Sequence, residues 1–247
     1  MRHQRTASGL RLMDLRDLDT RAIRDPNRIL AAMAINSTQH GLTAWLDRCA
    51  PADYDHLVVA EDRTDGRTVG ILSANDHASA AERFLFVDAA FVAPTARKRR
   101  IMRRMLATAL LQSARRGPVP LVIAVRTCNP MFFLALRRFA RYLPGATLYP
   151  ALEDTMVSLA AAKLARRIAR AISPACRFEP GTGVLRGTLV AHGLLGCAQP
   201  MPAYDPEIDT MFARRLGPVD QLLAVLDLRS IDEATILDKA RRLHRRH

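Results

Sequence analysis

The segment from residue 84 to residue 106 constrains the fold more than any other part of the sequence. Residues 84–92 form an apolar run rich in Phe and Val, which is typical of a buried strand. Pro94 has no backbone N–H to offer a sheet, so we expect the strand to end there. Ile101 and Leu106 then begin a helical pattern. The sequence therefore predicts a strand, a short turn and a helix.

The predicted turn is strongly basic. It carries Arg97, Lys98, Arg99, Arg100 and Arg103. The first N–H groups of a helix have no intrahelical acceptor, and the helix dipole favours negative charge at this end. Each basic group there opposes the dipole at a cost of about 0.3–1 kcal/mol. Because residues that destabilise a helix start in this way usually have a functional role, we expect this turn to bind an anionic group.

Five positions carry a family resemblance. Val92, Pro94, Arg97, Ile101 and Leu106 fall on the pattern of the acyl-CoA-binding segment of the GNAT acetyltransferase superfamily, which this stretch resembles. The chain departs from that pattern at two places, where the family has small residues and this sequence has Arg100 and Met102. The resemblance extends in general architecture over residues 10–150, and it is specific between residues 87 and 129.

The resemblance implies a fold and a cofactor. The fold would be α/β (α+β), with a mixed, mostly antiparallel central sheet flanked by helices. Residues 1–150 would form the acyltransferase core, and residues 151–247 a C-terminal extension packed on the same domain. Acetyl-CoA or another acyl-CoA would be the co-substrate, with no metal. Its binding residues would be Phe91 and Val92 through the main chain, the basic turn residues Arg97, Lys98, Arg99, Arg100 and Arg103, Ile101 and Met102 at the helix start, and Asn129.

The remaining elements follow from periodicity and from turn residues. We expect strands at residues 10–15, 56–60, 68–74, 120–126, 184–191 and 221–228. We expect helices at residues 101–116, 131–142, 155–172 and 232–246, and two more between 26 and 46. Asn129 should cap the second of these helices, and the helix at residues 155–172 should be amphipathic with a basic face. Residues 62–66 are expected to form a hairpin turn and residues 75–81 a loop. The strands before residue 92 should form an antiparallel meander, and residues 120–126 a buried parallel strand.

Acyl transfer to an amine needs a base for the ammonium group and a proton for the departing thiolate. The resemblance implies a carboxylate on a central strand as the base, and Asp88 is the first candidate, with Glu61 as a second. The family often has a Tyr seven residues after the Asn, but here that residue is Leu136. Tyr142 is therefore the candidate acid. The alternative for Asp88 is a carboxylate that faces solvent or pairs with an arginine, and the alternative for Tyr142 is a tyrosine used only for packing.

Composition limits the other classes of function. The formal net charge is +13, and Lys98, Lys163 and Lys239 are the only lysines, so arginine supplies most of the charge. This charge predicts affinity for anions. The four cysteines form no Cys-x-x-Cys pair, and His56, His77 and His192 have no metal-ligand spacing. The sequence shows no apolar run long enough to span a bilayer, and we expect a cytoplasmic protein.

Three functional hypotheses remain open. The first is an acyl-CoA-dependent N-acyltransferase that acts on an amine of a small molecule or a peptide. The second is a GNAT-like domain that binds CoA or a partner protein without catalysis, which the altered small positions favour. The third is nucleic-acid binding through the arginines, but an aromatic content of 5% gives little support to base stacking. The sequence leaves the acceptor, the acyl chain length and the formation of a homodimer open.

Overall fold

The computed structural model describes residues 10–14, 53–64, 66, 68–78, 82–93, 96, 100–152, 158–192 and 203–245. Its strands are β1 (Leu10–Asp14), β2 (His56–Asp62), β3 (Thr68–Ala78), β4 (Arg83–Val92), β5 (Val122–Thr127), β6 (Thr147–Tyr149), β7 (Arg177–Glu179), β8 (Val184–Arg186) and β9 (Gln221–Asp227). Its helices are α4 (Ile101–Arg116), α5 (Pro130–Ala140), α6 (Leu159–Ile172), α7 (Thr188–Ala191), α8 (Pro206–Arg215) and α9 (Glu233–Arg245).

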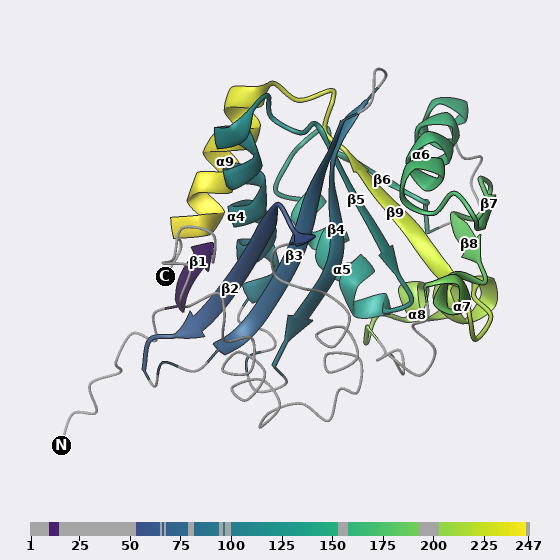
Figure 1. The fold of residues 1–247 in the computed structure, drawn as a ribbon, viewed down its shortest axis with the longest axis horizontal. Coiled ribbons are helices and arrows are strands. Elements are labelled where there is room, and N and C mark those ends of the chain that lie inside the picture. The colour runs from purple at the N-terminus through teal and green to yellow at the C-terminus, as the bar shows by residue number, and fades with distance from the viewer. Residues whose placement is uncertain are drawn as a thin grey trace.

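The described strands form one mixed sheet in the order β1-β2-β3-β4-β5-β9-β8-β7, with β6 beside β9 (Figure 1). The first four strands form an antiparallel meander, as predicted. The chain then passes through α4 to β5, which pairs with β4 in parallel. β9 returns antiparallel on the other side of β5. The predicted α/β class, with a mostly antiparallel sheet flanked by helices, is therefore confirmed.

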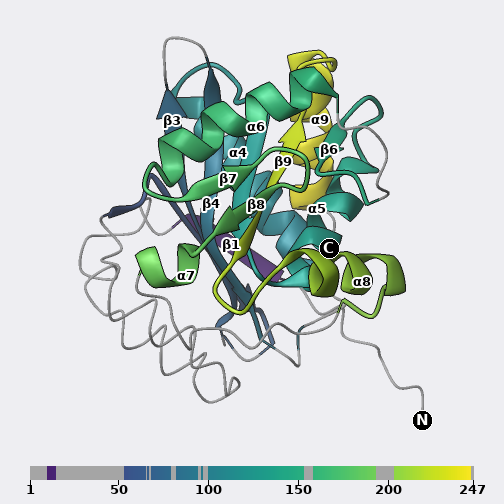
Figure 2. The ribbon, with the colours of Figure 1, turned by 90° about the vertical axis from the view of Figure 1, so that its right-hand side faces the viewer.

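Helices cover the two faces of the sheet. One face packs against α4, α5, α8 and α9, and its core includes Leu85, Met105 and Phe133. The opposite face packs against α6 through Leu164 and Ile168. Figure 2 shows α6 lying across that second face. Because successive strand residues alternate between faces, Leu85 and Val87 of β4 point toward α4, whereas Phe84 and Phe86 point toward α6.

The amphipathic helix predicted at residues 155–172 is confirmed as α6 from Leu159 onward. Its apolar residues Leu164 and Ile168 are buried, and its basic residues Lys163, Arg166, Arg167 and Arg170 are exposed. Ser158 caps the helix start, where its side chain accepts a hydrogen bond from the Ala161 N–H at 3.5 Å. Residues 153–157, which the prediction included, lie outside the described part of the chain.

Several predicted elements differ from the structure. The loop expected at residues 75–81 is wrong for residues 75–78, which continue β3 and pair with β4 as far as Arg83. The strand expected at residues 184–191 is wrong in its second half, since Thr188–Ala191 is a helical turn. Helix α8 and the short strands β6 and β7 were not predicted. The helices expected between residues 26 and 46 lie outside the described residues.

The C-terminal part of the chain contributes to the central sheet. β9 pairs with β5 from Val122 to Thr127, and α9 packs beside α4. In that contact the Arg104 Nη2 donates to the His244 carbonyl at 3.4 Å. The division of the chain at residue 150 stays a prediction. None of the described helices is both long enough and apolar enough to cross a bilayer.

The contact between β3 and α4 allows a test of the fold. A Cβ at Gly70 would lie 3.0 Å from Ile101 Cγ2 and 3.2 Å from the Met105 Cε, so these two side chains must move to accommodate a side chain there. We expect Gly70→Val to lower the free energy of unfolding by about 1–3 kcal/mol. Gly181→Val is the matched control, because nothing lies within 4 Å of its Cβ position. Urea denaturation measures both, and equal losses would contradict this packing.

Candidate active site

The sheet opens between β4 and β5. Their parallel ladder pairs Leu85 with Ile123, Phe86 with Ala124 and Val87 with Val125, and it ends there. β4 nevertheless runs on to Val92 and β5 to Thr127. β3 remains paired with β4 as far as Val92, and β9 with β5 as far as Thr127. Figure 1 shows that the two strands diverge beyond this point, and we call the stretch of the sheet between residues 88–92 and residues 126–127 the strand opening.

Asp88 lies at the narrow end of the strand opening. The β3–β4 register shifts there, because Ala74 pairs with Val87 whereas the preceding residue, Ser73, pairs with Ala89. Asp88 is therefore the extra residue of a β-bulge, a feature that redirects a side chain out of the regular ladder. Its Oδ2 accepts a hydrogen bond from the Tyr54 hydroxyl at 2.9 Å. Its Oδ1 lies 3.7 Å from the Arg126 Nη2.

Arg126 projects from β5 on the same face of the sheet as Phe86. Its Nη1 donates to the Ser173 Oγ at 2.8 Å and to the His192 Nε2 at 2.6 Å. The guanidinium carbon lies 5.9 Å from the centre of the Phe86 ring. Burial lowers the pKa of Arg126, although the nearby charge of Asp88 acts in the opposite direction. An arginine stays charged at neutral pH even so, so a buried cation faces a carboxylate at the strand opening.

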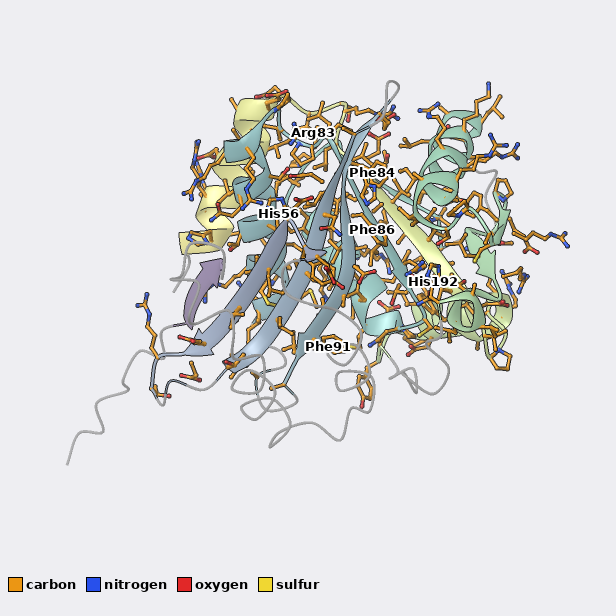
Figure 3. The ribbon with its side chains drawn as sticks, in the orientation of Figure 1. His56, Arg83, Phe84, Phe86, Phe91 and His192 are labelled. Atoms are coloured by element: carbon orange, nitrogen blue, oxygen red, sulfur yellow. The ribbon has the colours of Figure 1, made fainter. Side chains whose placement is uncertain are left out.

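His192 completes this cluster just after α7. Arginine has no hydrogen-bond acceptor, so the short contact requires the His192 Nε2 to accept and the imidazole to be neutral. Partial burial and the charge of Arg126 lower the pKa of His192, which favours the same neutral form. Figure 3 shows His192 near the lower ends of β5 and β9, with Phe84, Phe86 and Phe91 in succession along β4.

The start of α4 lies beyond the end of β4. Arg100 precedes the helix in the left-handed region, with φ 61°, and its side chain makes no capping hydrogen bond. No acidic residue lies in the first turn. Ile101 is buried, and Met102 packs against the core, whereas Arg100 is exposed. A left-handed backbone favours glycine, which agrees with the small residue expected at this position from the resemblance.

The predicted cofactor residues are distributed as follows. Phe91 and Val92 lie on the wide part of the strand opening, paired with Ile71 and Gly70 of β3. Asn129 caps α5, where its side chain accepts a hydrogen bond from the Met131 N–H at 2.9 Å, as predicted. Arg97, Lys98 and Arg99 lie outside the described residues.

The two other predicted catalytic residues lie apart from Asp88. The Tyr142 ring lies 4.7 Å from the guanidinium carbon of Arg103. Glu61 pairs with Thr68 on β3, which places it beyond the level of Val92. In the described part of the chain, no interaction joins either residue to Asp88. Their catalytic assignments stay predictions, and the structure brings Tyr54 to Asp88 instead.

Sequence reasoning missed four members of the cluster. Arg126 gave a local signal, because it is a charged residue near the end of an otherwise apolar strand and such residues seldom lack a reason. Tyr54, Ser173 and His192 gave no local signal. They come together with Arg126 only through pairing between distant parts of the chain.

A second polar cluster lies at the start of β2. The His56 Nε2 lies 2.9 Å from the Asp76 Oδ2, and the Ser113 hydroxyl donates to Asp76. Burial acts to raise the pKa of Asp76, but the hydrogen bonds from His56 and Ser113 outweigh it and the pKa lies below its usual value. Because Ser113 contacts the carboxylate and not the imidazole, this is not a nucleophilic triad. The cluster joins β3 to the end of α4.

Among the described residues, no group of three or more His, Cys, Asp or Glu side chains could hold a metal ion. The side chains that the described structure brings together at the strand opening are those of Asp88, Tyr54, Arg126, Ser173 and His192.

Comparison with protein families and with curated proteins found no match. Comparison with solved structures found acetyltransferases. An acetyltransferase of Bacillus subtilis in complex with CoA is 9% identical, with a TM-score of 0.41 over 89% of this chain and 99% of that chain. The diaminobutyrate acetyltransferase EctA of Paenibacillus lautus is 21% identical, with a TM-score of 0.39 over 57% of this chain and 81% of that one.

A nourseothricin acetyltransferase is 24% identical, with a TM-score of 0.31 over 38% of this chain. The match spans about half of that protein, 51% of its length. The solved structures that the comparison found thus include acetyltransferases. Similarity at this level says nothing of the substrate.

The contact between Arg126 and His192 predicts the titration of the imidazole. Burial and the arginine charge keep the pKa of His192 below its ordinary value of 6.5. The folded chain then holds this proton less tightly than the unfolded chain, so His192 destabilises the fold as the pH falls below about 6.5. In Arg126→Met the pKa of His192 should rise. NMR titration of the histidine ring, assigned with His192→Gln, measures it; an unchanged pKa would contradict the contact.

The backbone at Arg100 gives a second prediction. A left-handed conformation costs an L-residue about 1–2 kcal/mol, and a β-branched residue suffers most. Arg100→Val should therefore lower the free energy of unfolding by about 1–2 kcal/mol, whereas Arg100→Gly should not lower it. Urea denaturation of the two variants tests this. A glycine variant as unstable as the valine variant would show that residue 100 is not left-handed.

Proposed function

We propose that this chain is a divergent acyl-CoA-dependent N-acyltransferase of the GNAT type. The observation that carries the proposal is the strand opening, with a carboxylate at its narrow end and an uncapped helix N-terminus beyond the end of β4. A thioester held in this opening would have its carbonyl beside Asp88. The diphosphate of its CoA would lie at the first turn of α4.

The strand opening supports CoA binding in two ways. Main-chain groups of β4 from Asp88 to Val92, including Phe91, would receive the amides of the pantetheine arm. The N–H groups of Ile101, Met102 and Arg103 would receive the diphosphate, because the first turn of a helix has N–H groups without intrahelical acceptors. The absence of acidic residues in this turn favours an anion. Contributions from Arg97, Lys98 and Arg99 are part of this proposal.

The two faces of the sheet would separate the two substrates. The start of α4 packs on one face, whereas the side chains of Asp88 and Arg126 lie on the face of Phe86. CoA would therefore approach from the α4 side, and the amine from the α6 side. Both would meet at the strand opening, which suits direct attack of the amine on the thioester in a ternary complex.

Asp88 would act as the base. It would take a proton from the acceptor ammonium, and the resulting amine would attack the thioester carbonyl carbon. A C–N bond forms and the C–S bond breaks. The amide nitrogen loses its extra proton to water, and the departing sulfur takes up the proton held by Asp88. Tyr54, which donates to the Asp88 Oδ2, would hold the carboxylate in position during both transfers.

Acetyl-CoA binding tests the first part of this proposal. We expect acetyl-CoA to raise the melting temperature of the full chain, since a ligand that binds only the folded state stabilises it. The shift should be retained in Asp88→Asn. With an amine acceptor present, thiol release by Asp88→Asn should fall about 10²–10⁴-fold.

The matched control is Glu61→Gln, which should release thiol at the parent rate because Glu61 lies beyond the end of the strand opening. Loss of activity in Glu61→Gln with retention in Asp88→Asn would reverse the assignment of the base. Stabilisation by acetyl-CoA without thiol release over a panel of amines would favour a domain that binds CoA without catalysis. No stabilisation would contradict the proposal as a whole.

A further inference from the structure

Arg126 has more hydrogen-bonding capacity than the described chain uses. Its side chain is only 8% exposed. Its Nη1 donates to Ser173 and His192, but no hydrogen bond from its Nε or Nη2 to another described residue is found. Asp88 lies 3.7 Å from the Nη2, which is beyond hydrogen-bond distance. One edge of a buried guanidinium therefore remains without an acceptor in the described part of the chain.

Asp88 shows the complementary feature. Its Oδ2 accepts from Tyr54, whereas its Oδ1 accepts no hydrogen bond within the described residues. The side chain is 23% exposed, so a ligand has access to it. A donor edge and an acceptor oxygen of opposite charge thus lie side by side at the narrow end of the strand opening, close together but not bonded to each other.

The hydrogen-bond acceptors of Arg126 hold it in place but carry no charge. Ser173 and neutral His192 are uncharged acceptors, and Phe86 contributes its ring. Asp88 is the charged partner of Arg126, at 3.7 Å and without a hydrogen bond. Burying a charge is costly unless it is both paired and hydrogen-bonded, so the Nε–Nη2 edge would bind an anionic group of a ligand favourably.

We propose that the acceptor is a small amine that carries a carboxylate close to its reacting nitrogen, as in an amino acid. The carboxylate binds the Nε–Nη2 edge of Arg126, and the ammonium group binds the Asp88 Oδ1. This inference rests on the proposed function, because it assigns the acceptor of the same reaction. The planar fork of arginine matches a carboxylate with two parallel hydrogen bonds.

Binding of the acceptor at both Arg126 and Asp88 also explains the order of the binding and proton-transfer steps. Binding the carboxylate on Arg126 places the ammonium group against the oxygen of Asp88 that remains available. The proton then passes to Asp88, and the nitrogen that results lies at the end of β4 where the thioester would be. Ser173 and His192 act as positioning residues, since they fix the guanidinium and do not contact the acceptor.

Matched acceptors test this inference. The twenty common L-amino acids, L-ornithine and L-2,4-diaminobutyrate are each compared with their carboxamides, which keep the amine and the size but lose the negative charge. Thiol release is measured at saturating acetyl-CoA. For every acceptor that reacts, we expect kcat/KM for the acid to exceed that for the amide at least tenfold, mostly through KM.

Arg126→Gln should abolish this preference, bringing the ratio of acid to amide near one, while the KM for acetyl-CoA stays within about twofold. Arg229→Gln is the matched control, because it removes an arginine that pairs with Asp227 and Glu82 and should keep the preference. A readout that does not depend on turnover is the melting temperature with CoA and the acid, which should rise in the parent and not in Arg126→Gln. His192→Gln should reduce the preference only in part.

The outcomes separate the two proposals. Equal use of acids and amides by the parent, or an unchanged preference in Arg126→Gln, overturns the acceptor inference and leaves the transferase intact. Stabilisation by acetyl-CoA without reaction of any acid in the panel also overturns it. Absence of both stabilisation and reaction overturns the proposed function itself. The comparison of acids with amides needs only the parent protein, so an unstable Arg126→Gln does not prevent a decision.

Discussion

The early end of the parallel ladder between β4 and β5 determines the rest of the site. The ladder stops at Val87 and Val125 although both strands continue. Each strand is held on its other side, β4 by β3 as far as Val92 and β5 by β9 as far as Thr127. Because both outer ladders persist, the two strands stay fixed while they diverge. The result is a pair of diverging strands, with charged side chains where the divergence begins, inside a sheet whose two faces are otherwise packed with apolar side chains.

The side chains at the narrow end of the strand opening are unusual for a sheet interior. A bulge directs the Asp88 carboxylate out of the ladder, and the largely buried side chain of Arg126, near the end of β5, lies 3.7 Å from it. Bulges and buried charges both reduce stability unless something compensates for them, so their combination at one point favours function over packing. The polar cluster around Asp76 differs, because its members satisfy one another and join β3 to α4.

The sequence predicted what depends on local pattern. The meander, α4, β5 and β9 followed from apolar periodicity, and Asn129 from its capping chemistry. The cluster could not be predicted as a whole. Tyr54 and His192 reach Asp88 and Arg126 only after the strands from β2 to β8 have assembled into one sheet. The continuation of β3 through residues 75–78 was missed because their polar side chains resemble a loop. Strand 184–191 was wrong after residue 186, where Gly187 adopts φ 68° and starts a helical turn.

The most direct test of this account is a map of backbone amide exchange with and without CoA. The account predicts slower exchange along residues 88–92 and 100–103 when CoA is bound. It predicts no change in β7 or at the exposed face of α6, which lie away from the strand opening. Protection confined to the basic face of α6, or unchanged exchange along residues 88–92, would contradict the claim that the divergence of β4 and β5 forms the binding site.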